Sequence, residues 1–210
     1  MQAHGSFTVR AVTLATLLFP FLASVCGAQT LSFPVPAPSI KVGDQWHWER
    51  SDRRTGQKEG EVKRQVTAVT TSQIEGTDAE GRFITTPELN LIESSTARVS
   101  EVGRFLSFPL EADKKWDFNY AFTVKSSNAN IKWQVNATVV GIERVKVPAG
   151  EFDAVKIEYR GVFNNYGNGR SGRIRQTFWY APSVRGVVRN DFEDGYNMST
   201  TQLLSFKIEP

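Results

Sequence analysis

The segment 130–140 alternates apolar and polar side chains, and this alternation constrains the fold more than any other feature of the chain. Successive side chains along a β-strand point to opposite faces, so the pattern predicts a strand with one buried face. Other segments rich in β-branched and aromatic residues also have the character of strands. They lie at 45–51, 61–71, 82–93, 116–125, 152–162, 173–180, 186–191 and 199–208.

Turn-forming residues separate these segments. Glycine, mostly with aspartate, asparagine or proline, favours chain reversals at 55–56, 78–81, 148–150, 164–169 and 194–195. No segment combines spaced apolar residues with helix caps over more than three turns. The sequence therefore predicts an all-β single domain over 42–210, with about nine antiparallel strands in a strongly curved sheet or an incomplete barrel. Imperfect closure of such a sheet leaves room for a hydrophobic cavity.

The first 28 residues have the pattern of a secretory signal peptide. Arg10 precedes an apolar run at 11–23, and small residues lead to a candidate cleavage site between Ala28 and Gln29. The run is shorter than the roughly 20 residues that span a bilayer, so we expect no transmembrane anchor. The pattern predicts a periplasmic or secreted bacterial protein.

Cys26 is the only cysteine of the chain, and cleavage after Ala28 would remove it with the leader. The mature chain would then have no disulfide and no thiolate. In an alternative, Cys26 is the lipid-modified first residue of a lipoprotein. Val25 argues against this alternative, because such sites usually have Gly, Ala or Ser before the cysteine.

His47 would be the sole histidine of the mature chain. It lies between Trp46 and Trp48, and in a strand its side chain points to the face opposite the two tryptophans. We therefore predict an exposed histidine flanked by buried aromatic side chains rather than a general base.

The residues that follow the leader, 29–41, are rich in proline and predict an extended lead-in along the domain surface. A spacer or a ligand for a partner protein is the alternative interpretation. The formal net charge is +3, with basic residues spread among acidic ones. The densest basic group, Arg170, Arg173 and Arg175, is typical of a solvated hairpin, so we expect no nucleic-acid partner.

A search for reactive groups assigns no catalytic residue, metal site or cofactor. The chain has no Gly-x-Ser-x-Gly motif, and the tightest acidic group, Asp191, Glu193 and Asp194, is interpreted as a hairpin tip rather than a calcium site. Gly167 and Gly169 lie in a polar turn and open no phosphate-binding helix. We therefore expect a protein that is not an enzyme.

Three motifs resemble those of uncharacterised exported β-rich bacterial proteins that share a domain of unknown function. They are Pro-Ala-Gly-x-Phe at 148–152, Trp-Tyr-Ala-Pro followed by Gly-Val-Val at 179–188, and Gly-Asp-x-Trp at 43–46. These proteins are similar in organisation to the LolA-like lipoprotein carriers, whose curved sheet wraps a hydrophobic cavity. The resemblance implies a fold and a possible use, because the motifs contain turns and core aromatics but no reacting group.

Aromatic side chains on the predicted strands are the remaining candidates for function. As core residues they require no further explanation, but if they line a cavity they would bind an apolar molecule or a lipid. The candidate ligand-binding residues are Trp46, Trp48, Phe118, Trp133, Phe178 and Tyr180. We predict a carrier or binding protein; the alternative is a cell-envelope interaction protein that binds an envelope partner through its surface or edge strands.

Overall fold

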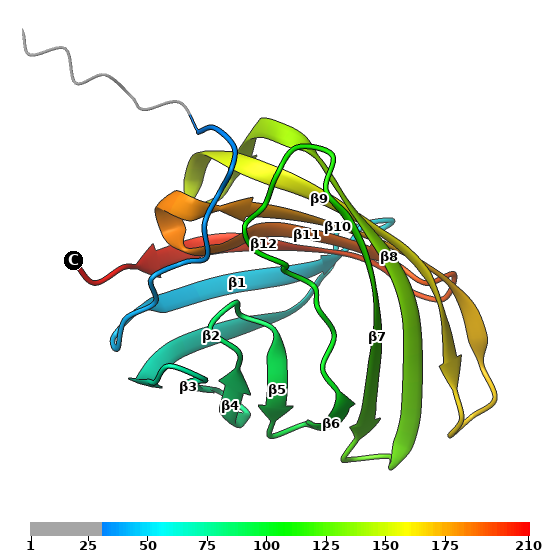
Figure 1. The fold of residues 1–210 in the computed structure, drawn as a ribbon. Helices are drawn as coiled ribbons and strands as arrows, with labels where there is room; N and C mark the ends of the chain where they lie inside the picture. The colour runs from blue at the N-terminus through cyan, green and yellow to red at the C-terminus, as the bar shows by residue number, and fades with distance from the viewer. Residues whose placement is uncertain (1–30) are drawn as a thin grey trace, which may run out of the picture.

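The computed structural model describes residues 31–210, so the predicted signal peptide at 1–28, its cleavage site and Cys26 lie outside the described residues. Twelve antiparallel strands form a closed barrel (Figure 1). Strands adjacent in sequence are adjacent in the barrel, and β1 pairs with β12 to complete it.

The strands are β1 (Gln45–Asp52), β2 (Lys58–Val69), β3 (Ile74–Asp78), β4 (Gly81–Thr85), β5 (Leu91–Ser94), β6 (Ala97–Glu101), β7 (Lys115–Val124), β8 (Ala129–Val147), β9 (Gly150–Asn165), β10 (Ser171–Ala181), β11 (Gly186–Glu193) and β12 (Met198–Lys207). A 3-10 helix, η1 (Pro182–Val184), connects β10 to β11. Within residues 31–210, no helix is both long enough and apolar enough to span a membrane.

The predicted all-β, antiparallel single domain is confirmed, and the barrel is closed rather than incomplete. The prediction of about nine strands was wrong, in part because the segment 82–93 forms two strands, β4 and β5, instead of one. Pro87 has no N–H to give to a sheet, and Leu89 adopts a positive φ of 68°, so the chain reverses between the two strands. The short strands β3 and β6 were also missed.

The Pro-Ala-Gly-x-Phe motif forms the turn that joins the two longest strands, β8 and β9. Gly150 has a φ of 134°, which a residue with a side chain rarely adopts. The N–H of Ala149 donates to the carbonyl oxygen of Leu203 at 3.0 Å, so the turn is fastened to β12. Phe152 then packs in the same buried cluster as Leu203.

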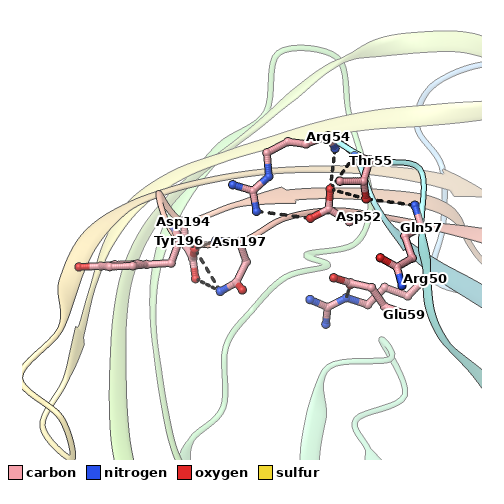
Figure 2. Close-up of polar contacts among 9 residues, drawn as sticks. All are labelled: Arg50, Asp52, Arg54, Thr55, Gln57, Glu59, Asp194, Tyr196 and Asn197. Carbon is pink, nitrogen blue, oxygen red and sulfur yellow. Dashed lines mark hydrogen bonds and ion pairs between the residues drawn. The ribbon is translucent and has the colours of Figure 1, made fainter.

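Turns at one end of the barrel are fixed by aspartate side chains (Figure 2). Asp52 Oδ1 accepts the N–H of Thr55 at 2.9 Å in the β1–β2 turn, and this bond, with others in the turn, lowers the pKa of Asp52. Asp194 Oδ1 accepts the N–H groups of Tyr196 at 2.9 Å and Asn197 at 2.7 Å in the β11–β12 turn. Both turns use the aspartate-to-backbone bonds expected of an Asx turn.

The aspartate of the Gly-Asp-x-Trp motif, Asp44, is completely buried just before β1. Its carboxylate accepts the backbone N–H groups of Lys41 at 3.0 Å and Glu209 at 2.8 Å. Nη1 of Arg185 also donates to both carboxylate oxygens, to Oδ1 at 3.1 Å and to Oδ2 at 3.0 Å. One side chain therefore joins the start of the barrel, its end and the turn after η1.

The connection between β6 and β7, residues 102–114, packs its middle part into the barrel core while its two ends stay exposed, and we call it the interior segment. Figure 1 shows it in green, rising from β6 before the chain returns as β7. Leu106 and Leu110 of this segment are buried in the core. Leu110 exchanges two backbone hydrogen bonds of 2.8 Å with Val35, so residues near the start of the described chain also join this core.

We predict that Asp44→Ala destabilises the fold by about 3–5 kcal/mol, because it leaves the Arg185 guanidinium and two backbone N–H groups without their acceptor. Denaturant unfolding of the mature protein measures this loss. The matched control is Asp153→Ala, which removes an exposed ion pair with Arg144 and should cost less than about 1 kcal/mol. Equal losses for the two variants would contradict the structural role of Asp44.

Candidate functional site

A partly open pocket of about 360 Å³ lies inside the barrel, and we call it the barrel pocket. Strands from both sides of the β1–β12 seam contribute to it, together with the interior segment. Its apolar lining includes Trp46, Val66, Phe83, Leu89, Leu106 and Phe178. Size and lining match those of small-molecule sites, which are predominantly apolar with a few polar groups.

Trp46 and Trp48 form one wall of the barrel pocket. Alternation along β1 places them on the same face, and their rings stack with centroids 6.2 Å apart and an interplanar angle of 16°. Each indole N–H donates to a backbone carbonyl, from Trp46 to Val184 at 2.7 Å and from Trp48 to Val187 at 2.9 Å. With their polar atoms satisfied, both rings offer apolar surface to the pocket.

Polar groups of the barrel pocket include two arginines and a threonine, Arg64, Arg185 and Thr85. The Arg64 guanidinium lies 4.8 Å from the ring centroid of Phe83, a cation–π distance. Burial lowers the pKa of Arg64, whereas the nearby carboxylate of Asp78 raises it, and an arginine stays protonated under either influence. The pocket therefore combines apolar walls with fixed positive charge.

Three of the six predicted ligand-binding residues, Trp46, Trp48 and Phe178, line the barrel pocket. Tyr180 does not, because its side chain is fully buried and contacts Phe108 with ring centroids 5.2 Å apart. Burial raises the pKa of the Tyr180 phenol. The structure thus brings half of the predicted set together on one surface.

The other two, Phe118 and Trp133, pack instead around Phe105 of the interior segment, in what we call the aromatic cluster. Ring centroids lie between 4.9 and 6.2 Å from that of Phe105 for Phe118, Tyr120, Trp133, Tyr159 and Phe178. The aromatic cluster fills one part of the barrel. Phe178 belongs to the aromatic cluster and also lines the barrel pocket, so it separates the two.

The interior segment is held in place by polar bonds to the surrounding barrel. The Asn90 amide donates from Nδ2 to the carbonyl oxygen of Leu106 at 2.8 Å, and its Oδ1 accepts the Leu106 N–H at 2.9 Å. The Tyr159 hydroxyl donates to the carbonyl oxygen of Phe105, and the Trp116 indole donates to that of Arg104 at 2.7 Å. These bonds fix Leu106 as a wall of the barrel pocket.

Sequence reasoning missed Arg64 and Thr85, although Arg64 left a signal. Val62, Arg64 and Val66 are spaced by two residues and therefore share one face of β2. A basic residue thus stands at a position where the alternation predicts an apolar one. Thr85 ends β4 and is 4% exposed. No pattern within 82–93 distinguishes it from a core threonine.

The histidine and the acidic residues considered for catalysis or metal binding do not line the barrel pocket. Nε2 of His47 donates a 2.7 Å hydrogen bond to the carboxylate oxygen Oε2 of Glu61, as expected for a residue on the face opposite the tryptophans. Asp191 accepts two hydrogen bonds from Arg189 and one from Thr200. Burial alone would raise the pKa of Asp191, but these bonds outweigh it and lower the pKa. Within residues 31–210, no cluster of three or more His, Cys, Asp or Glu side chains could hold a metal.

Comparison with protein families finds one match that spans more than half of the chain. A family model described as DUF3108-like matches residues 84–204. The matched part runs from β4 to β12, so it includes the interior segment and one side of the barrel pocket. None of the curated proteins matches the chain.

Two solved structures share the fold. The first is a protein from Bacteroides fragilis NCTC 9343, described as exported and with a YmcC-like fold; it has a TM-score of 0.58 at 16% identity, covering 83% of this chain and 99% of that one. The second, from Parabacteroides distasonis ATCC 8503, is described as a lipoprotein; it has a TM-score of 0.54 at 17% identity, covering 81% of this chain and 97% of that one. At these identities the likeness shows the fold alone.

We predict that Asn90→Ala releases the interior segment. It leaves the Leu106 N–H and carbonyl unpaired, and each orphaned buried group costs about 1–3 kcal/mol. Hydrogen exchange should accelerate at the Leu106 amide, and the free energy of unfolding should fall. Asn119→Ala, at an exposed position of β7, is the control and should leave both unchanged. Unchanged exchange at Leu106 in Asn90→Ala would show that the segment is held by other contacts.

We also predict that stability falls as pH rises above about 10, the pKa of an unfolded tyrosine. Burial raises the pKa of Tyr120 to about 12 and also raises the pKa of Tyr159 well above its ordinary value, so the folded state keeps protons that the unfolded state releases. Each such tyrosine contributes a slope of roughly −1.4 kcal/mol per pH unit between its two pKa values. Denaturant unfolding at pH 9, 10 and 11 measures the slope. Tyr120→Phe should make it shallower, and an unaltered slope would contradict the burial of that phenol.

Proposed function

The chain belongs to the DUF3108-like family, and we propose that it is an exported protein that binds or carries an apolar or lipid-like molecule. The proposal rests on this membership, on the barrel pocket and on the exported or lipoprotein descriptions of the structural neighbours. The barrel pocket is the proposed binding site. The predicted signal peptide at 1–28 supports a periplasmic or secreted location. The sequence resemblance to proteins organised like LolA-like carriers supports the same class of ligand.

One observation carries this proposal: the barrel interior is only partly filled. The aromatic cluster occupies one part, while the tryptophan wall, Phe83 and Leu106 surround about 360 Å³ of open space. Apolar surface buried by a ligand contributes about 0.8 kcal/mol per CH₂ group, so a chain of ten carbons would gain roughly 8 kcal/mol before the cost of association. A hydrocarbon chain is therefore a suitable occupant.

The proposed role is binding rather than catalysis. The acidic side chains that a carboxylate mechanism would use are committed elsewhere, Asp191 to Arg189 and Asp44 to Arg185. His47 is bonded to Glu61 on the face of β1 opposite the tryptophan wall. The groups that reach the pocket bind and orient a molecule without supplying a nucleophile or a general base.

The alternative is an envelope protein that acts through its surface or edge strands. In the described part of the chain, each of the twelve strands has a hydrogen-bonded neighbour on both sides, although on one side the pairing covers only part of β2, β7 and β12. Val35 of the proline-rich lead-in is 1% exposed and pairs with Leu110, so part of the lead-in is already occupied. These observations favour the pocket over edge pairing.

Native mass spectrometry of the mature protein, purified gently from its exported compartment, tests the proposal. A discrete added mass that is lost on denaturation, and that organic extraction identifies as an apolar molecule or lipid, would support it. A bare protein mass, repeated after incubation with envelope lipids, would overturn it and direct attention to partner proteins.

We predict that Thr201→Phe, which adds a ring to the pocket lining at a partly exposed position, lowers affinity for a bound hydrocarbon chain about tenfold or more. A lost burial of two CH₂ groups is sufficient for such a change. Thr138→Phe is the control, because Thr138 is a partly exposed threonine of β8 outside the pocket lining. Titration with dodecanoate, followed by tryptophan fluorescence, measures both. Equal affinities in the two variants would place the ligand elsewhere.

A further inference from the structure

Two buried polar atoms of the barrel pocket have no hydrogen-bond partner within residues 31–210. They are Nε of Arg64 and Oγ1 of Thr85, and both residues line the pocket. A third such atom, Oε1 of Gln176, belongs to a residue outside the pocket lining. Buried donors without partners are costly and uncommon, so two of them at one apolar pocket indicate a ligand that supplies acceptors.

The carboxylate beside Arg64 does not satisfy it. Oδ2 of Asp78 lies 3.6 Å from Nε of Arg64, which is too long for a hydrogen bond. The other oxygen, Oδ1, accepts the backbone N–H of Glu80 at 3.0 Å and thereby holds the β3–β4 turn. Asp78 thus offsets part of the positive charge of Arg64 but leaves the Nε–H of Arg64 without an acceptor.

Arg185, the second arginine of the barrel pocket, differs in this respect. Its Nη1 donates to both oxygens of the buried Asp44, so its charge is neutralised by a partner that also anchors the chain. Arg64 instead spreads its guanidinium over the Phe83 ring, whose face attracts a cation but accepts no conventional hydrogen bond. Of the two, Arg64 is the one placed to bind an anion.

We propose that the molecule bound in the barrel pocket is an amphiphile with an acidic head group, whose oxygens accept hydrogen bonds from Arg64 while its hydrocarbon chain packs against Trp46 and Trp48. This inference rests on the proposed function and names the chemical class of its ligand. Carboxylate and phosphate oxygens both match the planar fork of a guanidinium, so the head group is defined by charge rather than by its central atom. Thr85 adds a hydroxyl donor to the same pocket.

The experiment compares probes that share a chain and differ in the head group. Dodecanoate, dodecanol and dodecyltrimethylammonium are titrated below their aggregation concentrations into the mature protein, with calorimetry and tryptophan fluorescence as readouts. Acetate and inorganic phosphate test the head group without a chain. We expect dodecanoate to bind about tenfold or more tightly than dodecanol, because charge-assisted hydrogen bonds are the stronger kind. Dodecyltrimethylammonium, acetate and phosphate should bind more weakly still.

Variants assign the preference to Arg64. Arg64→Met keeps a long apolar side chain and should bring the affinities for dodecanoate and dodecanol within about threefold of each other. Arg64→Lys keeps the charge and should retain most of the preference for the acid, which protects the test if Arg64→Met folds poorly. Lys63→Met is the matched control, since it removes one positive charge from the adjacent, exposed position of β2 and should leave the preference intact.

The outcomes separate the two proposals. Equal binding of dodecanoate and dodecanol by the parent protein would overturn the acidic head group and leave an apolar carrier standing. A preference for the acid that survives in Arg64→Met would overturn the role of Arg64. Acetate or phosphate binding as tightly as dodecanoate would show a site for small anions and overturn the amphiphile. Failure of all three twelve-carbon probes to bind would overturn the proposed function together with this inference.

Discussion

The buried carboxylate of Asp44 is the contact on which the barrel depends most. A charge removed from water is tolerable only if donors surround it, and Asp44 has the Arg185 guanidinium and two backbone N–H groups. These donors come from three distant parts of the chain, so the carboxylate fixes the register of β1 against β12 and the position of the turn before β11. Arg185 adopts a positive φ of 52° there, and the next residue, Gly186, leaves space for the Trp46 ring. The ion pair therefore holds the turn against which the Trp46 ring of the pocket packs.

The interior segment decides what the barrel can hold. A closed barrel of twelve strands is wider than its own inward side chains fill, and larger barrels enclose cavities or channels. The middle of the interior segment enters this space and divides it, with Phe105 at the centre of a packed aromatic cluster and Leu106 at the edge of the pocket. The remaining volume has the size of a ligand site rather than of a channel.

The alternation of side chains predicted most strands and the antiparallel class, because that period follows from strand geometry alone. It did not predict β3, which is short and interrupted by Gly76, where a side chain would collide with the ring of Phe83. The path of the interior segment could not be predicted either, since it has no period and its place depends on the finished barrel. For the site, Trp46, Trp48 and Phe178 could be selected as inward aromatics, but Phe118 and Trp133 share their pattern and pack around Phe105 instead.

The pairing of β1 with β12 has a consequence for how the protein acquires its structure. Trp46 lies opposite Phe206, so the contact that completes the barrel joins residues from opposite ends of the chain. Contacts of such long sequence separation carry a high entropic cost of closure and make folding slow. A chain that emerges in order from its N-terminus can pair β1 with β2 at once, but the other edge of β1 waits until the last strand, β12, follows. In that order of folding, an open sheet with its apolar inner face in water precedes the completed barrel.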